Sequence, residues 1–191
     1  YQNNKISALR PVAFSAFNDC SIRKPNAKKI SEKKNWGEEC TGIAEQWQAI
    51  DTFQAGSILD NIHITSYIKR AGKLIQYGVD SPVTGYQYFY TKLLAWMLKT
   101  FNQQKDFGPL EDLALYLREL KQPKQIIVSL GATRYTPFGE TGFLQPDDEL
   151  GIFVYDSRLG QAENIEQFFS NEDKASDFNA GVALLQRVKQ R

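Results

Sequence analysis

The sequence predicts one helix-rich domain of the α+β class, in which amphipathic helices pack against a small β-sheet. Hydrophobic residues make up 42% and charged residues 24% of the chain, which is typical of ordinary globular proteins. Apolar residues recur at helical spacing through the first two thirds of the chain, and short β-branched runs follow. No repeat or linker divides the sequence, so we expect residues 1–191 to form a single domain. A three-layer α/β architecture is the alternative.

Three short strands are expected, near residues 9–17, 125–131 and 150–156. In the first, Val12 and Phe14 alternate with smaller residues, and Pro11 favours a sheet edge because it lacks a backbone donor. The second contains the run Ile126-Ile127-Val128, which is β-branched as buried strands often are. The second and third strands are expected to pair antiparallel across the loop between them.

Helical spacing predicts three or four helices before these last two strands. Residues 43–58 and 64–75 carry apolar stripes that belong either to one bent helix or to two helices, and Gly78 is a natural helix stop. The helix expected around residues 84–101 is apolar on most sides, so it and Trp96 should lie at the centre of the fold. The last of these helices should begin after Gly108-Pro109. The closing segments, 161–169 and 175–188, also show helical spacing.

Residues 18–39 are polar and are interrupted by Pro25 and Gly37, which predicts a basic loop or arm. Its part from residue 21 to residue 36 has a net charge of +5, because one acid, Glu32, accompanies six bases: Arg23, Lys24, Lys28, Lys29, Lys33 and Lys34. Such an arm could bind phosphates or an acidic partner by counterion release, with Trp36 available for stacking. Alternatively, it is a solvated loop whose charges balance acids elsewhere.

Two cysteines lie in this N-terminal quarter. A bridge between Cys20 and Cys40 would close a loop of about 20 residues and stabilise an exported protein by roughly 3 kcal/mol. Two reduced thiols in a cytoplasmic protein are equally compatible with the sequence. A structural zinc site is not expected, because two cysteines and one histidine do not supply four ligands.

The region from residue 131 to residue 158 contains the first-choice site, because long loops rich in Gly and Pro often carry function. Arg134 and Tyr135 are binding candidates within it. The carboxylates of Asp147, Asp148 and Asp156 could instead converge on a divalent cation that activates water. Pro146-Asp147 followed by Asp156-Ser157-Arg158 resembles the metal-dependent nuclease pattern, with Arg in place of Lys. In that case, Arg134 or Arg158 would stabilise developing negative charge.

Two other interpretations of this loop remain open. The turn at Gly131-Ala132-Thr133 could present backbone amides to a phosphate. The loop could also be a plain connection whose acids keep it solvated. Outside it, His63 is the single histidine and is expected to be a packed or capping residue near a helix start. Any Ser-His-Asp or Cys-His catalytic device would have to use it.

Several common functions lack their sequence signature here. Phosphate-loop, dinucleotide-binding, zinc-protease and nucleophile-elbow motifs are absent. No apolar run approaches the roughly 18 residues of a membrane helix, and a net charge of +1 does not favour nucleic acid as the partner. The sequence therefore favours a non-catalytic binding or assembly domain for a protein or anionic partner, without a cofactor. The alternative is a metal-dependent hydrolase or nuclease that uses a divalent cation and the carboxylates of residues 131–158.

Overall fold

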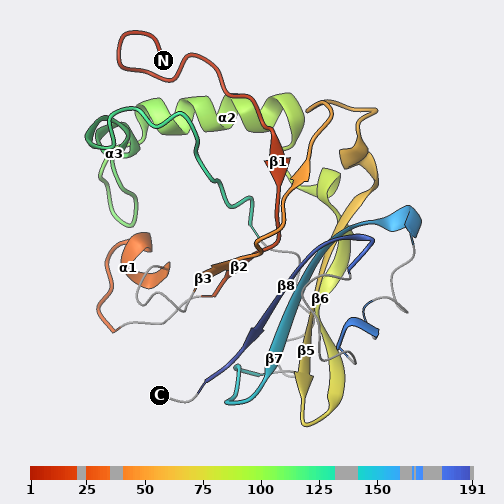
Figure 1. Ribbon diagram of the computed structural model, residues 1–191. Helices are drawn as coiled ribbons and strands as arrows, with labels where there is room; N and C mark the ends of the chain where they lie inside the picture. The colour runs from red at the N-terminus through yellow and green to blue at the C-terminus, as the bar shows by residue number, and fades with distance from the viewer. Residues whose placement is uncertain are drawn as a thin grey trace.

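A four-stranded antiparallel sheet is the largest element of the fold (Figure 1). The computed structural model describes residues 1–20, 25–34, 41–131, 142–159, 165, 167–169 and 178–189. The strand order is β6-β5-β7-β8. The strands are β5 (Ile62–Arg70), β6 (Lys73–Pro82), β7 (Glu149–Asp156) and β8 (Gly181–Arg187). Strand β7 therefore lies inside the sheet, bonded to β5 on one side and β8 on the other.

The hairpin that joins β5 to β6 is set by two residues. Arg70 pairs with Lys73, and between them Ala71 and Gly72 have φ angles of 49° and 79°. Positive φ at both central residues is the signature of the hairpin turn whose twist matches that of its strands. Glycine at the second position adopts this conformation without a steric penalty.

The predicted helix-rich class is wrong, because residues 43–58 and 64–75 form strands, turns and a short 3-10 helix, η1 (Ile58–Asn61), instead of the expected helical segments. The sheet has apolar side chains on both faces, so β5 lacks the simple alternation that marks a half-buried strand. Its buried residues, Ile62, Thr65 and Ile68, recur every three positions. That spacing imitates a helical stripe.

Each face of the sheet supports its own core. One core includes Ile62, Ile152 and Val154 and continues to Phe89 and Leu93 near the start of helix α2 (Tyr90–Gln103). The other core is aromatic, and its buried members are Phe153, Tyr155, Ile165, Phe168, Phe169, Phe178 and Ala180. Gly151 lies beside this second core, where an added Cβ would come within 2.6 Å of the Phe169 ring.

The remaining strands are short. The expected strand near 9–17 is found only in part, as β1 (Ala13–Phe14) paired with β4 (Gln48–Ala49) and β2 (Phe17–Asp19) paired with β3 (Thr41–Ile43). The expected strand near 150–156 is confirmed as β7. The expected strand at 125–131 and its pairing with β7 are wrong, because these residues form no strand and β7 pairs instead with β5 and β8.

The two helices expected near the C-terminus have different outcomes. The helix expected at 175–188 is wrong, because β8 occupies that segment and pairs with β7 along its length. Gly181 allows this close pairing, since an added Cβ would approach the Val154 carbonyl oxygen to 2.2 Å. Of the segment 161–169, only residue 165 and residues 167–169 are described, and these are helical.

Helix α2 lies beside a shorter helix, α3 (Leu113–Glu119), away from the turn between β5 and β6 (Figure 1). Helices α2 and α3 confirm the expected helices after residues 84 and 109, and the side chain of Asp112 caps the N-terminus of α3. The central position expected for α2 is wrong, because Leu93 is its one buried residue and Trp96 is 45% exposed. The other short helices are α1 (Ile30–Lys34), η2 (Val83–Gly85) and η3 (Ser157–Leu159). Within the described residues, no helix is long and apolar enough to cross a bilayer.

Candidate functional site

The three candidate carboxylates of the cation hypothesis each bind an arginine. Asp148 is almost fully buried and accepts two hydrogen bonds from Arg70, of 2.8 Å to Oδ1 and 2.7 Å to Oδ2. The backbone amide of Gln145 donates a third, of 2.8 Å. The Arg70 hydrogen bonds, assisted by the Gln145 amide, hold the pKa of Asp148 below its ordinary value. This carboxylate is thus fully engaged in joining β5 to the start of β7.

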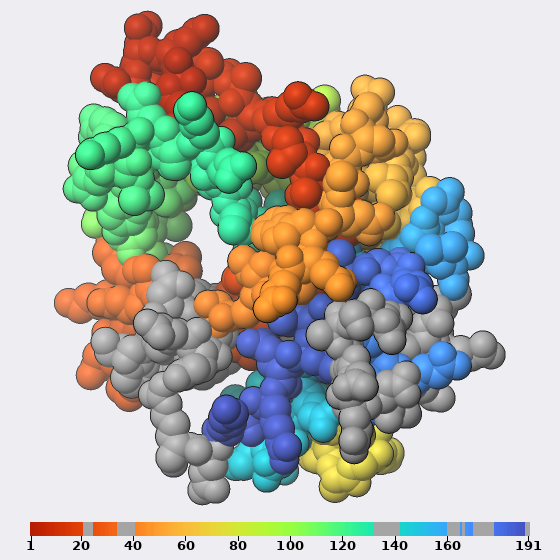
Figure 2. All heavy atoms as spheres, viewed as in Figure 1, coloured from red at the N-terminus to blue at the C-terminus, as the bar shows by residue number. Residues whose placement is uncertain are grey.

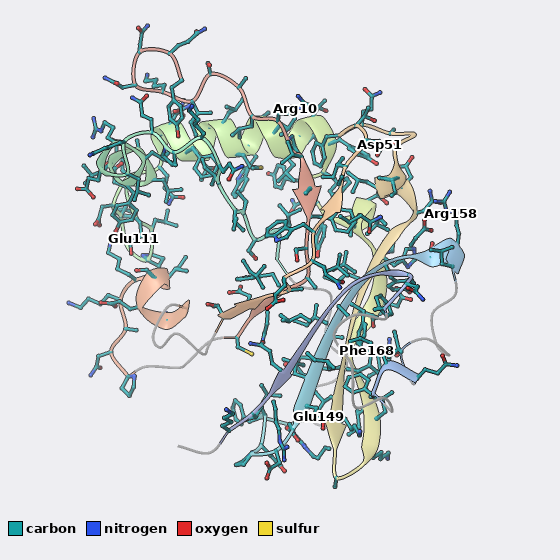
Figure 3. The ribbon with its side chains drawn as sticks, viewed as in Figure 1. Arg10, Asp51, Glu111, Glu149, Arg158 and Phe168 are labelled. Carbon is teal, nitrogen blue, oxygen red and sulfur yellow. The ribbon has the colours of Figure 1, made fainter. Side chains whose placement is uncertain are left out.

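Asp147 and Asp156 have different arginine partners and lie far apart. Asp147 is exposed and bonds to Arg187, whereas Asp156 is buried and bonds to Arg158, which lowers the pKa of Asp156. Figure 3 shows Glu149 and Arg158 at opposite ends of β7, so Asp148 and Asp156 also lie at opposite ends. Within the described ranges, no three acidic, histidine or cysteine side chains could share a metal ion. The structure therefore does not bring these carboxylates together.

The basic arm is described in part. Arg23, Lys24, Trp36 and the side chain of Lys34 lie outside the described residues. The side chains of Lys28 and Lys33 are exposed. Lys29 instead forms an ion pair with Asp106 and donates to the carbonyl of Leu110 at 2.9 Å. Lys29 thus attaches α1 to the segment that follows α2.

Other predicted site residues are placed only in part or not at all. Arg134 and Tyr135 fall in residues 132–141, outside the described part of the chain, as does Cys40. Cys20 is half-buried and its backbone amide donates to Asn18. The bridge between Cys20 and Cys40 therefore stays a prediction.

A polar network that the sequence did not indicate crosses three adjacent strands at one end of the sheet. His63 on β5 contacts Asp80 on β6, with 2.8 Å between Nδ1 and Oδ1. Tyr155 on β7 donates its hydroxyl to the other oxygen of Asp80 at 2.5 Å. The phenol is buried, while His63 and Asp80 are partly exposed, with 28% and 24% of their side-chain surfaces accessible. Asp80 therefore links a buried phenol to an imidazole that solvent can reach.

The register of the sheet explains how these three side chains meet. His63 lies directly opposite Tyr155, and their ring centroids are 6.0 Å apart. On the other side, β6 has a bulge in which Val79 and Asp80 together oppose Thr65. Bulges redirect a side chain and are over-represented beside functional sites. Here the bulge accompanies the turn of Asp80 toward His63.

Sequence analysis missed this network because His63 was placed near a helix start, whereas it lies in a strand. The available signal was the β-branched and aromatic content of residues 62–70, followed by Ala71-Gly72 and a second such run. That hairpin would have placed residue 63 near residues 80–82. It could not have shown the bulge or the Tyr155 contact.

A second feature is the apolar surface of residues 86–131, which we call the open helical half. Its buried residues are Phe89 and Leu93 alone, and every residue of this range is described. Nine large apolar side chains in it are exposed: Tyr88, Trp96, Phe107, Leu110, Leu115, Tyr116, Leu120, Ile127 and Leu130. Figure 2 shows this green-to-teal region gathered apart from the blue and cyan strands of the sheet. Contiguous exposed apolar patches mark interaction surfaces, and these nine side chains are the candidates for such a patch.

The last part of the open helical half has no regular secondary structure and few hydrogen bonds to other described residues. Tyr1 donates to the carbonyl of Pro123, and Tyr86 donates to that of Gly131. Between them, no hydrogen bond joins the backbone of residues 125–130 to another described residue. Yet this segment contains the Ile126-Ile127-Val128 run that favours a strand. Residues with a high strand propensity here have backbone donors and acceptors without partners in the described part of the chain.

The fold and its two sites define a class: a predominantly β domain with a four-stranded antiparallel sheet, a bulged polar network and an open helical half. The chain belongs to DUF5718, a family of unknown function, whose family model matches residues 1–188. No curated protein and no solved structure matches the chain.

Proposed function

We propose that this chain is an assembly domain whose open helical half packs against a second copy of the same chain. The observation that carries the proposal is segment 125–130, whose backbone has no hydrogen-bond partner among the described residues and which carries the exposed side chain of Ile127 and ends at the exposed Leu130. A β-branched segment with free backbone groups can pair with a strand from another chain. Such pairing would supply the backbone partners that residues 125–130 lack within the described part of the chain.

A second copy suits this surface for two physical reasons. Antiparallel pairing of one segment with itself about a two-fold axis is self-complementary, as closed dimers require. The net charge of the chain is only +1, so two copies experience little overall repulsion. The exposed residues also match the aromatic and aliphatic composition of homodimer interfaces.

Sedimentation velocity over a range of protein concentrations tests this proposal. We expect reversible self-association of the wild type, weakened at least tenfold by Ile127→Lys, because a charge would be placed where apolar side chains meet. Val12→Lys is the matched control, since Val12 is 61% exposed, close to the 64% of Ile127, but lies outside the open helical half. Monomeric wild type at every concentration, or equal weakening by both variants, would contradict the proposal.

An anionic partner is a second proposal, supported by the exposed side chains of Lys28 and Lys33. The predicted binding set comprises these two lysines with Arg23, Lys24, Lys34 and Trp36. Lys29 contributes less, because it already pairs with Asp106. Binding to heparin or single-stranded DNA should weaken steeply with added salt and fall further in a Lys28→Gln, Lys33→Gln double variant. Absence of binding at low salt would end this proposal.

A further inference from the structure

The network of His63, Asp80 and Tyr155 has features that a purely structural histidine does not require. A carboxylate can only accept hydrogen bonds, so His63 must donate from Nδ1 to Asp80. In the neutral imidazole, this leaves the lone pair on Nε2. Within the described residues, Nε2 has no hydrogen-bond partner, and the ring is partly open to solvent. The proton-accepting nitrogen is therefore the one turned away from Asp80.

The carboxylate that orients this imidazole is itself held in place. Tyr155 donates to Asp80 Oδ2 from within the aromatic core, where it is 1% exposed. Burial raises the pKa of the Tyr155 phenol far above its ordinary value, and the hydrogen bond to Asp80 raises it further. Tyr155 thus stays a hydrogen-bond donor throughout the physiological pH range. A base oriented by a third, fixed group is the arrangement on which proton-transfer sites depend.

We propose that His63 is the general base of a small catalytic site at this end of the sheet, taking at Nε2 the proton of water or of a substrate hydroxyl. In the proton-transfer step, the O–H bond breaks as the Nε2–H bond forms, and the oxygen keeps the electron pair for attack on its electrophile. His63 keeps its Nδ1 proton, which stays hydrogen-bonded to Asp80, and the ionised carboxylate offsets the positive charge of the imidazolium. The bond between the electrophile and its leaving group then breaks, and the Nε2 proton passes to that group, which restores the neutral ring. Asp80 and Tyr155 act as positioning residues.

Because His63 is the single histidine of the chain, its reactivity can be measured without interference from other imidazoles. Diethyl pyrocarbonate, which acylates a neutral imidazole nitrogen, is the probe. We expect the folded wild type to react at residue 63, as shown by the ultraviolet band of the product and by peptide mass spectrometry. In Asp80→Asn, the rate constant should fall about fivefold, because the amide no longer stabilises positive charge on the ring. His63→Gln supplies the background.

Asp60→Asn is the matched control. Asp60 also accepts a hydrogen bond from a tyrosine, Tyr90, but the described structure shows no histidine contact there. The reactivity of His63 should therefore be unchanged in this variant. A wild type that is unreactive while folded, or equal rate constants in the wild type and Asp80→Asn, would overturn the proposal.

A second measurement uses the wild type alone, so it tests the proposal even if the Asp80→Asn variant does not fold. The tautomer of the neutral imidazole can be read from its nitrogen chemical shifts, recorded on the wild type at a pH where the ring carries no charge. We expect the proton on Nδ1 and the lone pair on Nε2. Predominance of the Nε2–H tautomer would overturn the proposal, because Nε2 would then be unable to accept a proton.

Discussion

The sheet and the open helical half use apolar residues in opposite ways. In the sheet, Phe153 is fully buried and its ring meets those of Phe168, Phe169 and Phe178 at centroid distances of 5.2–5.8 Å. In the open helical half, Trp96 is 45% exposed and stacks only on Tyr88, which is itself exposed, among the described aromatic rings. The difference shows that apolar side chains pack against one another in the sheet but remain exposed in much of the open helical half, which is the observation on which the proposed assembly role rests.

The largest expected effect is at the centre of the aromatic core. Phe153→Ala should lower the free energy of unfolding by about 3–5 kcal/mol, because it leaves a cavity that rigid neighbouring rings cannot fill. Trp96→Ala should cost less than about 1 kcal/mol when measured at low protein concentration. Urea denaturation followed by circular dichroism measures both values. Equal losses would show that the two halves are packed alike.

The next largest effect on stability is expected at the ion pair between Arg70 and Asp148. Asp148→Ala should cost about 3 kcal/mol, because it leaves the Arg70 guanidinium without its buried partner. Asp147→Asn is the neighbouring control, because it removes the charge but keeps a residue type that tolerates the φ of 70° at this position. It should cause no measurable change, since Asp147 and Arg187 are both largely exposed. Thermal unfolding measures both variants, and a large loss in Asp147→Asn would contradict the distinction between buried and exposed pairs.

The same pair predicts a pH dependence. The pKa of Asp148 is lower in the folded chain than in the unfolded chain, so unfolding is accompanied by proton uptake in acid. The contribution of Asp148 to stability is therefore complete at neutral pH and is lost as the pH falls through its folded pKa. In Asp148→Ala, the free energy of unfolding should decline less steeply between about pH 5 and pH 2. Equal slopes in wild type and variant would contradict this assignment.

The smallest expected effect on stability is at the hairpin turn between β5 and β6. Gly72→Ala should cost about 1 kcal/mol, because residue 72 has a φ of 79° while no atom lies within 4 Å of an added Cβ. Gly85→Ala is the control, since its added Cβ would meet only an ordinary contact at 3.7 Å. Chemical denaturation should separate the two variants. An unchanged stability in Gly72→Ala would mean that the turn relaxes.

The comparison also explains what could be predicted from the sequence. Helices α2 and α3 were predictable, because their apolar spacing and the Gly108-Pro109 start are local signals. Strand β5 was not, because two cores cover the sheet and its buried residues recur every three positions. The exposure of Trp96 was equally hidden, because amphipathic spacing shows which residues form a stripe but not which surface covers it.

The candidate site was less predictable than the fold. Asp147 and Asp148 are adjacent in sequence, yet one is exposed and the other is buried against Arg70. His63 was recognised as the residue on which histidine chemistry would depend, but its partners come from two other strands. Asp80 lies near His63 because β6 has a bulge at that point, and Tyr155 lies near His63 because the two residues are paired in the β5–β7 register. No local sequence pattern predicts either feature.

Hydrogen–deuterium exchange at two protein concentrations tests the central claim, that the open helical half is an assembly surface. Peptides from β7 should exchange slowly at both concentrations, because their backbone is bonded on both sides. Peptides covering residues 125–130 should exchange rapidly in dilute protein and become protected when the protein is concentrated. Fast exchange of residues 125–130 at both concentrations would contradict the account.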